Sequence, residues 1–316
     1  MRRTFLQQLS AGVLAFAGLP ARAETAIRYV VPAPPGGLID SMARLAGQGL
    51  TERLKQPIVV DNKPGANTVL GADLVAKSAP DGQTWLAVSS TLAANAGLPG
   101  ATFDSEKLLT PVALLAVTPM GVVVPAHSPY HALGDLVKAV KGGKVLNVGS
   151  SGNGTPPHLA LALFQSATGT QQTHVPYKGG SPSLVDLIGG QIDVVFSTLT
   201  ESNGFIKGGK LRLLALMSEK RLADYPQVPT TAEAGLPGLL MAGWTGIMVP
   251  SATPQAVVQK ISDAAVALAR DPAFVKQAET AGFVVTPKGT AEFGRFYKDE
   301  VGRMRALIKE QNIRMD

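Results

Sequence analysis

The chain has 316 residues, 45% of them hydrophobic and 16% charged, which allows a sizeable buried core in one large or two medium domains and excludes a disordered chain. Its formal net charge of +6 falls to +3 when Arg2, Arg3 and Arg22 are set aside, so the charge gives no reason to expect a nucleic-acid partner. The chain contains no cysteine, which excludes disulfide bonds, thiolate metal sites and a cysteine nucleophile.

The first 23 residues have the pattern of an export signal. Arg2 and Arg3 precede an apolar run over 9–19, and Ala21-Arg22-Ala23 has the form of a cleavage site. The alternative is a transmembrane helix, but the run is about half of the roughly 20 residues that a span requires. The paired arginines also fit a twin-arginine signal, so the export route stays open. We expect an exported mature protein.

In the rest of the chain, short apolar strands alternate with amphipathic helices. The first unit is a strand over 27–32, a glycine turn, and a helix with apolar positions from Leu38 to Leu54. The pattern then predicts strands at 58–60, 85–88, 146–148, 192–196 and 211–216, and helices at 69–77, 133–140, from 156 onward, and at 182–188. Three helices are expected at the end, over 254–269, 272–281 and 291–311.

Two apolar stretches that end in proline, 120–125 and 245–250, are expected to cross between two lobes. The predicted fold is α/β, with a first lobe from 24–123 plus 246–316, a second lobe from 124–245, and a helical C-terminal tail. Ligands of open α/β sheets bind where strands end, so a cleft between the lobes is the expected site.

Two glycine turns each follow a strand and precede a helix. They are Pro34-Pro35-Gly36-Gly37 and Ser150-Ser151-Gly152-Asn153-Gly154-Thr155. Glycine lets the backbone approach a ligand, and a helix start presents unpaired N–H groups with partial positive charge. The turns therefore predict a site where main-chain groups hold a carboxylate, with candidates Pro35, Gly36, Gly37, Ser151, Gly152, Gly154 and Thr155. Thr155 is also a natural N-cap, which would explain it without a ligand.

Further candidate contacts each have a structural alternative. Asp40 fits the first turn of a helix without any ligand, and a helical His158 is usually a packing or surface residue. Ser90 and Thr91 end a strand, Gly179 precedes a helix start, and Ser197 and Thr198 follow a strand where a plain turn is the alternative.

Enzyme motifs are incomplete in this chain. The segment Gly149-Ser150-Ser151-Gly152-Asn153 lacks the last glycine of a nucleophile elbow. Gly143-Lys144 is followed by Val145 in place of the serine or threonine of a phosphate-binding loop, and the four histidines show no metal-ligand spacing. We expect neither an enzyme nor a cofactor.

Five segments match a known pattern, in order: VPAPPGGLID at 31–40, DNKPGA at 61–66, GSSGNGTPPHLA at 149–160, VPYKG at 175–179 and VPTTAEAGLPG at 228–238. Together they resemble the Bug family of periplasmic substrate-binding proteins of tripartite tricarboxylate transporters. The resemblance implies a Venus-flytrap fold that binds a small carboxylate at the two glycine turns. The family often has two glycines where this chain has Asn67 and Thr68.

The resemblance does not choose the carboxylate, because family ligands include dicarboxylic acids, amino acids and aromatic acids. It implies membrane permease subunits as partners. The alternative is a sensory input protein that docks on a membrane sensor kinase. A monomer is expected.

Overall fold

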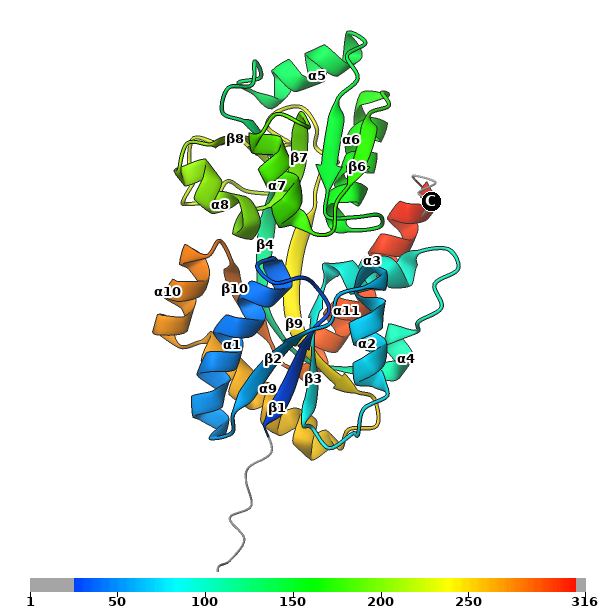
Figure 1. The fold of residues 1–316 in the computed structure, drawn as a ribbon, viewed down its shortest axis with the longest axis vertical. Coiled ribbons are helices and arrows are strands. Elements are labelled where there is room, and N and C mark those ends of the chain that lie inside the picture. The colour runs from blue at the N-terminus through cyan, green and yellow to red at the C-terminus, as the bar shows by residue number, and fades with distance from the viewer. Residues whose placement is uncertain (1–25, 311–316) are drawn as a thin grey trace, which may run out of the picture.

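The computed structural model describes residues 26–310 as two lobes joined by two strands, β4 and β9 (Figure 1). The first lobe contains β1 (Ile27–Val31), β2 (Ile58–Asn62), β3 (Thr84–Ser89) and β10 (Val284–Lys288), and the second contains β5 (Asn147–Ser150), β6 (Thr173–Pro176), β7 (Val194–Thr198) and β8 (Leu211–Leu216). The joining strands are β4 (Leu109–Pro125) and β9 (Ala242–Pro250). The expected export signal lies outside the described residues.

The strand order is β2-β1-β3-β9-β4-β7-β5-β6, and β8 and β10 also pair with β4. Near each outer edge the strands are parallel, whereas every pairing of β4 and β9 is antiparallel. Along β4, Pro119 pairs with Ala242 of β9, and the next residue, Met120, pairs with Thr198 of β7. The long β4 strand thus leaves one sheet and enters the other, while the residue boundaries expected for the lobes stay a prediction.

Helices cover both sheets (Figure 1). Those of the first lobe are α1 (Leu38–Leu54), the 3-10 turn η1 (Ala66–Thr68), α2 (Val69–Ala76), α3 (Ser90–Gly97), α4 (Ser105–Leu108), α9 (Gln255–Ala269), α10 (Pro272–Thr280) and α11 (Thr290–Glu310). Those of the second lobe are α5 (Leu133–Lys141), α6 (Pro156–Thr168), α7 (Gly180–Ile188) and α8 (Leu199–Lys207). No helix within residues 26–310 is long and apolar enough to cross a membrane.

The predicted α/β alternation is confirmed, and the structure adds elements that the sequence pattern did not reveal. These are the first part of β4, the strands β6 and β10, the 3-10 turn η1, and the helices α3, α4 and α8. Ser90 and Thr91 were expected to end a strand, but both lie in the first turn of α3, because the Ser89 hydroxyl accepts the Thr91 N–H and caps the helix. Ser197 and Thr198 were expected after a strand and instead form the end of β7.

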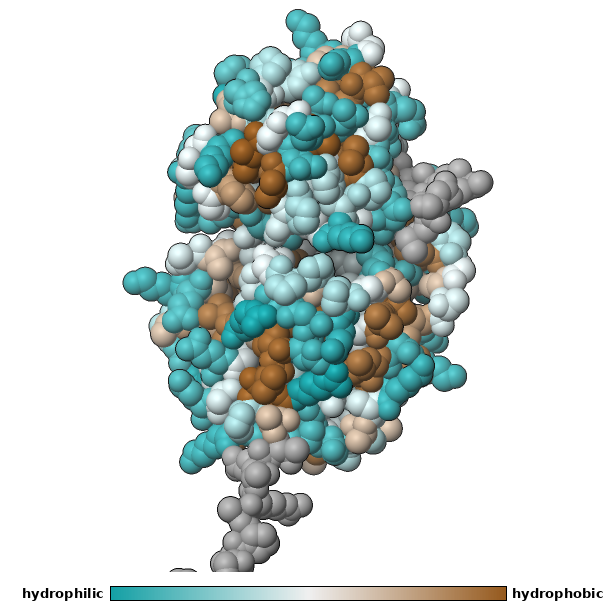
Figure 2. Space-filling model, viewed as in Figure 1, coloured by the Kyte–Doolittle hydropathy of each residue, from teal (hydrophilic) through white to brown (hydrophobic). Residues whose placement is uncertain are grey.

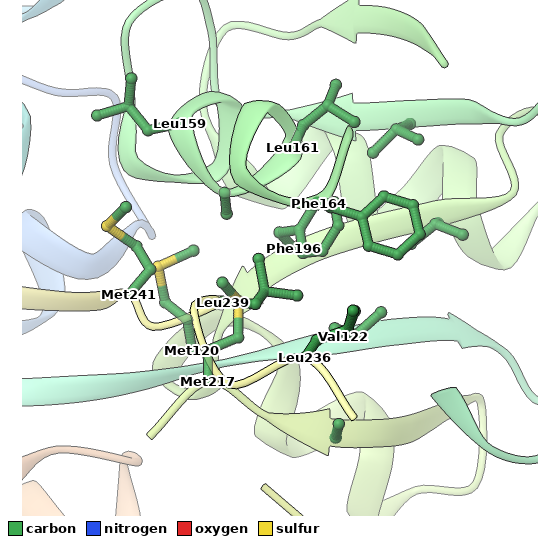
Figure 3. Close-up of a cluster of buried hydrophobic side chains, with 14 of the residues drawn as sticks. Met120, Val122, Leu159, Leu161, Phe164, Phe196, Met217, Leu236, Leu239 and Met241 are labelled. Carbon is green, nitrogen blue, oxygen red and sulfur yellow. The ribbon is translucent and has the colours of Figure 1, made fainter. Parts of the chain in front are cut away.

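The hydrophobic core of the second lobe also receives side chains from the first. Figure 3 shows part of this cluster, where Leu159, Phe164 and Phe196 lie near a group of three methionines. Met304 and Ile308 of α11 belong to the same cluster and are fully buried. The C-terminal helix therefore packs against both lobes, in agreement with its course alongside the second lobe in Figure 1.

Candidate functional site

A cleft of about 1210 Å³ lies between the lobes. Its walls come from the turns that precede α1, α6 and α7, from the η1 loop, and from the start of α3. Mostly hydrophilic and neutral residues border the boundary between the lobes on the face that Figure 2 shows. Many of the wall residues are prolines, so the cleft combines rigid apolar surface with a few polar groups, as small-molecule sites commonly do.

The first glycine turn is shaped by one of the protein's own carboxylates. Gly36 has a φ of 85°, which suits glycine, and its N–H donates to Asp40 Oδ2 at 2.9 Å. Asp40 also accepts from Arg44 Nε and Asn62 Nδ2, both at 2.9 Å. Burial acts to raise the pKa of Asp40, but the hydrogen bonds from Arg44, Gly36 and Asn62 outweigh it and hold that pKa below its ordinary value. Asp40 therefore lies beneath the turn and fixes its shape.

The second glycine turn also uses its own amides. The Gly152 N–H donates to Ser150 Oγ at 3.1 Å, and the Gly154 N–H donates to His158 Nδ1 at 3.0 Å. Thr155 occupies the N-cap position that the sequence predicted, but its hydroxyl donates to the Gly152 carbonyl at 2.6 Å and makes no cap bond. The expected capping hydrogen bond is wrong, because the turn brings a backbone acceptor closer to that hydroxyl.

The α6 helix that follows this turn is a poor source of free N–H groups. It begins with Pro156 and Pro157, which have no N–H. An ordinary helix start presents four unpaired donors, and two of these positions are proline here. Both prolines line the cleft, so this helix start contributes apolar surface in place of main-chain donors.

Three residues that line the cleft, all on the first lobe, carry buried side-chain donors without a partner. The side-chain atoms Asn67 Nδ2, Thr68 Oγ1 and Ser90 Oγ are buried and have no hydrogen-bond partner among residues 26–310, and all three residues line the cleft. Ser90 is 1% exposed and Thr68 is 7% exposed. A buried polar group without a partner costs about 1–3 kcal/mol, so three of them in the wall of one cleft point to a ligand that accepts hydrogen bonds.

The backbone at this position is strained as well. Ala66, Asn67 and Thr68 have φ values of 46°, 49° and 78°. Non-glycine residues avoid this region, and a β-branched threonine there is an outlier that costs of order 1–3 kcal/mol. Asn67 and Thr68 were not among the predicted contacts. The sequence feature that could have indicated them is that Asn67 and Thr68 stand where the Bug family often has two glycines.

The other missed residue is Glu201, on the first turn of α8. Its side chain lines the cleft, and its Oε2 accepts the Thr198 hydroxyl at 3.0 Å. Burial raises the pKa of Glu201, and hydrogen bonds from Thr198 and the Leu38 N–H offset this rise only in part. Nothing in the sequence marked it, because its position depends on how the two lobes meet.

Nine of the predicted contacts line the cleft: Pro35, Gly37, Ser90, Thr91, Ser151, Gly152, Thr155, Gly179 and Thr198. Five do not: Gly36, Asp40, Gly154, His158 and Ser197. Of these, Ser197 is buried and donates its hydroxyl to the Thr198 carbonyl at 2.9 Å. The structure thus brings both glycine turns to one cleft, while several of the predicted groups serve to hold the turns in shape.

Comparison with known proteins assigns the family. A family model described as "Tripartite tricarboxylate transporter family receptor" matches residues 42–313. The chain belongs to this receptor family. It is 34% identical to Protein BugT of Bordetella pertussis over 298 residues, which cover 92% of this chain and 90% of BugT. The resemblance to Bug proteins is therefore confirmed, and because the family consists of solute receptors, so is the expectation that the chain is not an enzyme.

Solved structures agree with this assignment. The periplasmic binding protein BugD superposes with a TM-score of 0.86 at 27% identity, over 91% of this chain and 98% of BugD. MatC of Rhodopseudomonas palustris with malate gives a TM-score of 0.84 at 29% identity, over 90% of this chain and 98% of that protein. The R. palustris protein Rpa4515 with adipate gives a TM-score of 0.87 at 29% identity, over 91% of this chain and 97% of that protein. The receptor thus has the two-lobed periplasmic-binding-protein fold with two crossover strands.

Proposed function

We propose that this receptor captures a small carboxylate in the periplasm, by closure of its cleft, and delivers it to the membrane subunits of a tripartite tricarboxylate transporter. The single observation that carries the proposal is the set of unpaired donors on Asn67, Thr68 and Ser90 in the cleft. A carboxylate offers about four acceptor positions on two oxygens, which suits several donors that converge.

Hydrogen bonds to the carboxylate can supply enough binding free energy without a buried arginine. A hydrogen bond to a charged group contributes about 1.5–3 kcal/mol, and micromolar affinity corresponds to about 8 kcal/mol. Three side-chain donors, supplemented by groups of the two glycine turns, reach this range. The relatives with malate and adipate support a carboxylate as the ligand class.

The proposed closure of the cleft rests on the division of the candidate ligand contacts between the two lobes. Asn67, Thr68 and Ser90 belong to the first lobe, whereas Ser151, Gly152 and Gly179 belong to the second. A ligand that contacts both sets stabilises the closed arrangement relative to the open one, because the second contacts exist only when the lobes meet. The closed form would then be the form that the membrane subunits recognise.

The proposal is tested by a thermal-shift screen of the mature protein with mono-, di- and tricarboxylates, amino acids and aromatic acids. A bound ligand raises Tm by mass action, and isothermal titration then gives Kd. We expect at least one carboxylate to bind with a Kd of about 10 μM or tighter, and an Asn67→Ala/Ser90→Ala variant to lose at least about 30-fold. Absence of any stabilising carboxylate would refute the proposal. Uptake of the identified acid in a strain that lacks the receptor, with and without the restored protein, tests the transport role.

A further inference from the structure

Glu201 lies where the two lobes meet. It projects from the first turn of α8 in the second lobe, and its carboxylate accepts the N–H of Leu38 at the start of α1 in the first lobe. Gly180 makes room for it, and Gly37 lies beside it. A Cβ on Gly37 would lie 3.4 Å from Oε1, and a Cβ on Gly180 would overlap the carboxylate itself. The starts of α1 and α7 thus enclose this side chain from both lobes.

The carboxylate has no cationic partner in the described part of the chain. No lysine or arginine among residues 26–310 forms an ion pair with Glu201. Lys178 is the only other charged residue among the described residues that line the cleft, and it is exposed. Burial raises the pKa of Glu201 despite the hydrogen bonds from Thr198 and Leu38, so its charge is incompletely compensated.

A structural role accounts for part of this arrangement. An acidic residue in the first turn of a helix interacts favourably with the macrodipole. A surface position would give the same benefit without desolvation, whereas Glu201 is largely enclosed and keeps a partly exposed edge in the cleft. Thr198 and Leu38 use two of its roughly four acceptor positions. Acceptor capacity therefore remains on the side where a ligand would lie.

We propose that Glu201 determines specificity, by selecting a carboxylic acid that also carries a protonated nitrogen. The ligand carboxylate would lie at the unpaired donors of Asn67, Thr68 and Ser90, and its nitrogen would face Glu201. A dicarboxylate without a nitrogen would instead place a second negative charge toward a carboxylate whose own charge is incompletely compensated. This inference rests on the proposed function, since it assigns the ligand class of the same cleft.

The test compares acids that differ by one amine. Kd is measured by isothermal titration for succinate and L-aspartate, glutarate and L-glutamate, and 3-phenylpropionate and L-phenylalanine. In the wild-type protein we expect the amine-bearing member of the best-binding pair to bind at least tenfold more tightly. In the nearly isosteric Glu201→Gln variant we expect that ratio to fall below threefold. Glu52→Gln, an exposed change on α1, should leave the ratio unchanged.

Three other results separate the possible failures. If the amine-free members bind as tightly as their partners in the wild-type protein, the inference is overturned and the proposed function stands. If Glu201→Gln weakens both members of a pair equally, Glu201 acts in lobe closure alone and the inference is again overturned. If no carboxylate binds the wild-type protein, the proposed function itself fails. If the Glu201→Gln variant folds poorly, the Kd ratio of amine-bearing to amine-free acids in the wild-type protein still tests the predicted preference for a nitrogen.

Discussion

His158 and His174 stack face to face, with ring centroids 4.0 Å apart and planes within 2° of parallel. The pair lies behind the second glycine turn and contacts it at two points. His158 Nδ1 accepts the Gly154 N–H, and His174 Nε2 is 2.6 Å from Ser150 Oγ. These neutral rings therefore hold the turn that forms one wall of the cleft.

Acid should destabilise the protein through this pair. Burial, together with the neighbouring His158, lowers the pKa of His174 to about 4, and burial also lowers the pKa of His158. Between about pH 6.5 and pH 4 the unfolded chain binds protons that the folded chain does not, so stability falls as pH falls through this window. Each histidine contributes at most about 1.4 kcal/mol per pH unit, and less here because both rings remain partly in solvent.

The measurement is Tm from pH 7.5 to pH 4.5. His174→Gln should flatten the decline relative to the wild-type protein, while His131→Gln, an exposed change, should leave it as it is. An identical pH profile in all three proteins would show that the stacked pair does not govern acid stability.

Replacement of Thr68 by glycine should separate stability from binding. The change relieves the positive φ of 78° but removes a buried, unpaired hydroxyl at a residue that lines the cleft. We expect the free energy of unfolding to stay constant or rise by up to about 1 kcal/mol, and ligand affinity to fall about tenfold. Urea unfolding and titration with the identified acid measure the two effects.

Lys55→Gly is the matched control, because Lys55 also has a positive φ, of 53°, but lies exposed at the end of α1. It should gain stability by a similar amount and bind the ligand normally. Thr68→Gly with unchanged affinity would remove Thr68 from the site.

Ser90 and Ser105 allow a second comparison, since both are 1% exposed. The Ser105 hydroxyl forms a 2.6 Å hydrogen bond with the Tyr297 hydroxyl, whereas the Ser90 hydroxyl has no partner within residues 26–310. Ser105→Ala should therefore lower the free energy of unfolding by about 1–2 kcal/mol with no effect on binding. Ser90→Ala should raise the free energy of unfolding of the free protein by up to about 1–3 kcal/mol, because it removes an unpaired buried hydroxyl, and should weaken carboxylate binding about tenfold. The reverse pattern would mean that Ser90 is structural.

Gly180 and Glu201 should be energetically coupled. A methyl group on Gly180 would overlap the Glu201 carboxylate, so Gly180→Ala alone must displace that side chain. In a Glu201→Ala background the three atoms nearest to the new methyl group are absent. We expect a coupling free energy of about 1–3 kcal/mol in a double-mutant cycle of unfolding free energies. Additive effects would show that the two residues do not share this space.

The sequence by itself determined the α/β alternation, the two glycine turns and the family. These features are local, because hydrophobic periodicity, glycine after a strand and contiguous motifs such as VPAPPGGLID are readable over a few residues. The helix starts at Leu38 and Pro156 follow directly from such patterns. The sequence did not show that the amides of these turns bind partners within the protein. Asp40 and His158, which accept the Gly36 and Gly154 N–H groups, were predicted only as possible ligand contacts.

Tertiary structure decided which groups remain free for a ligand. Ser90 and Thr68 come from different elements and become a donor pair only when η1 and α3 pack together. Glu201 is an ordinary helix-start acid until the fold packs it against Gly180 of its own lobe and Leu38 of the other lobe. Whether a polar atom is paired depends on every neighbour within hydrogen-bond distance. Those neighbours lie far apart in the chain, so no local pattern could have supplied the answer.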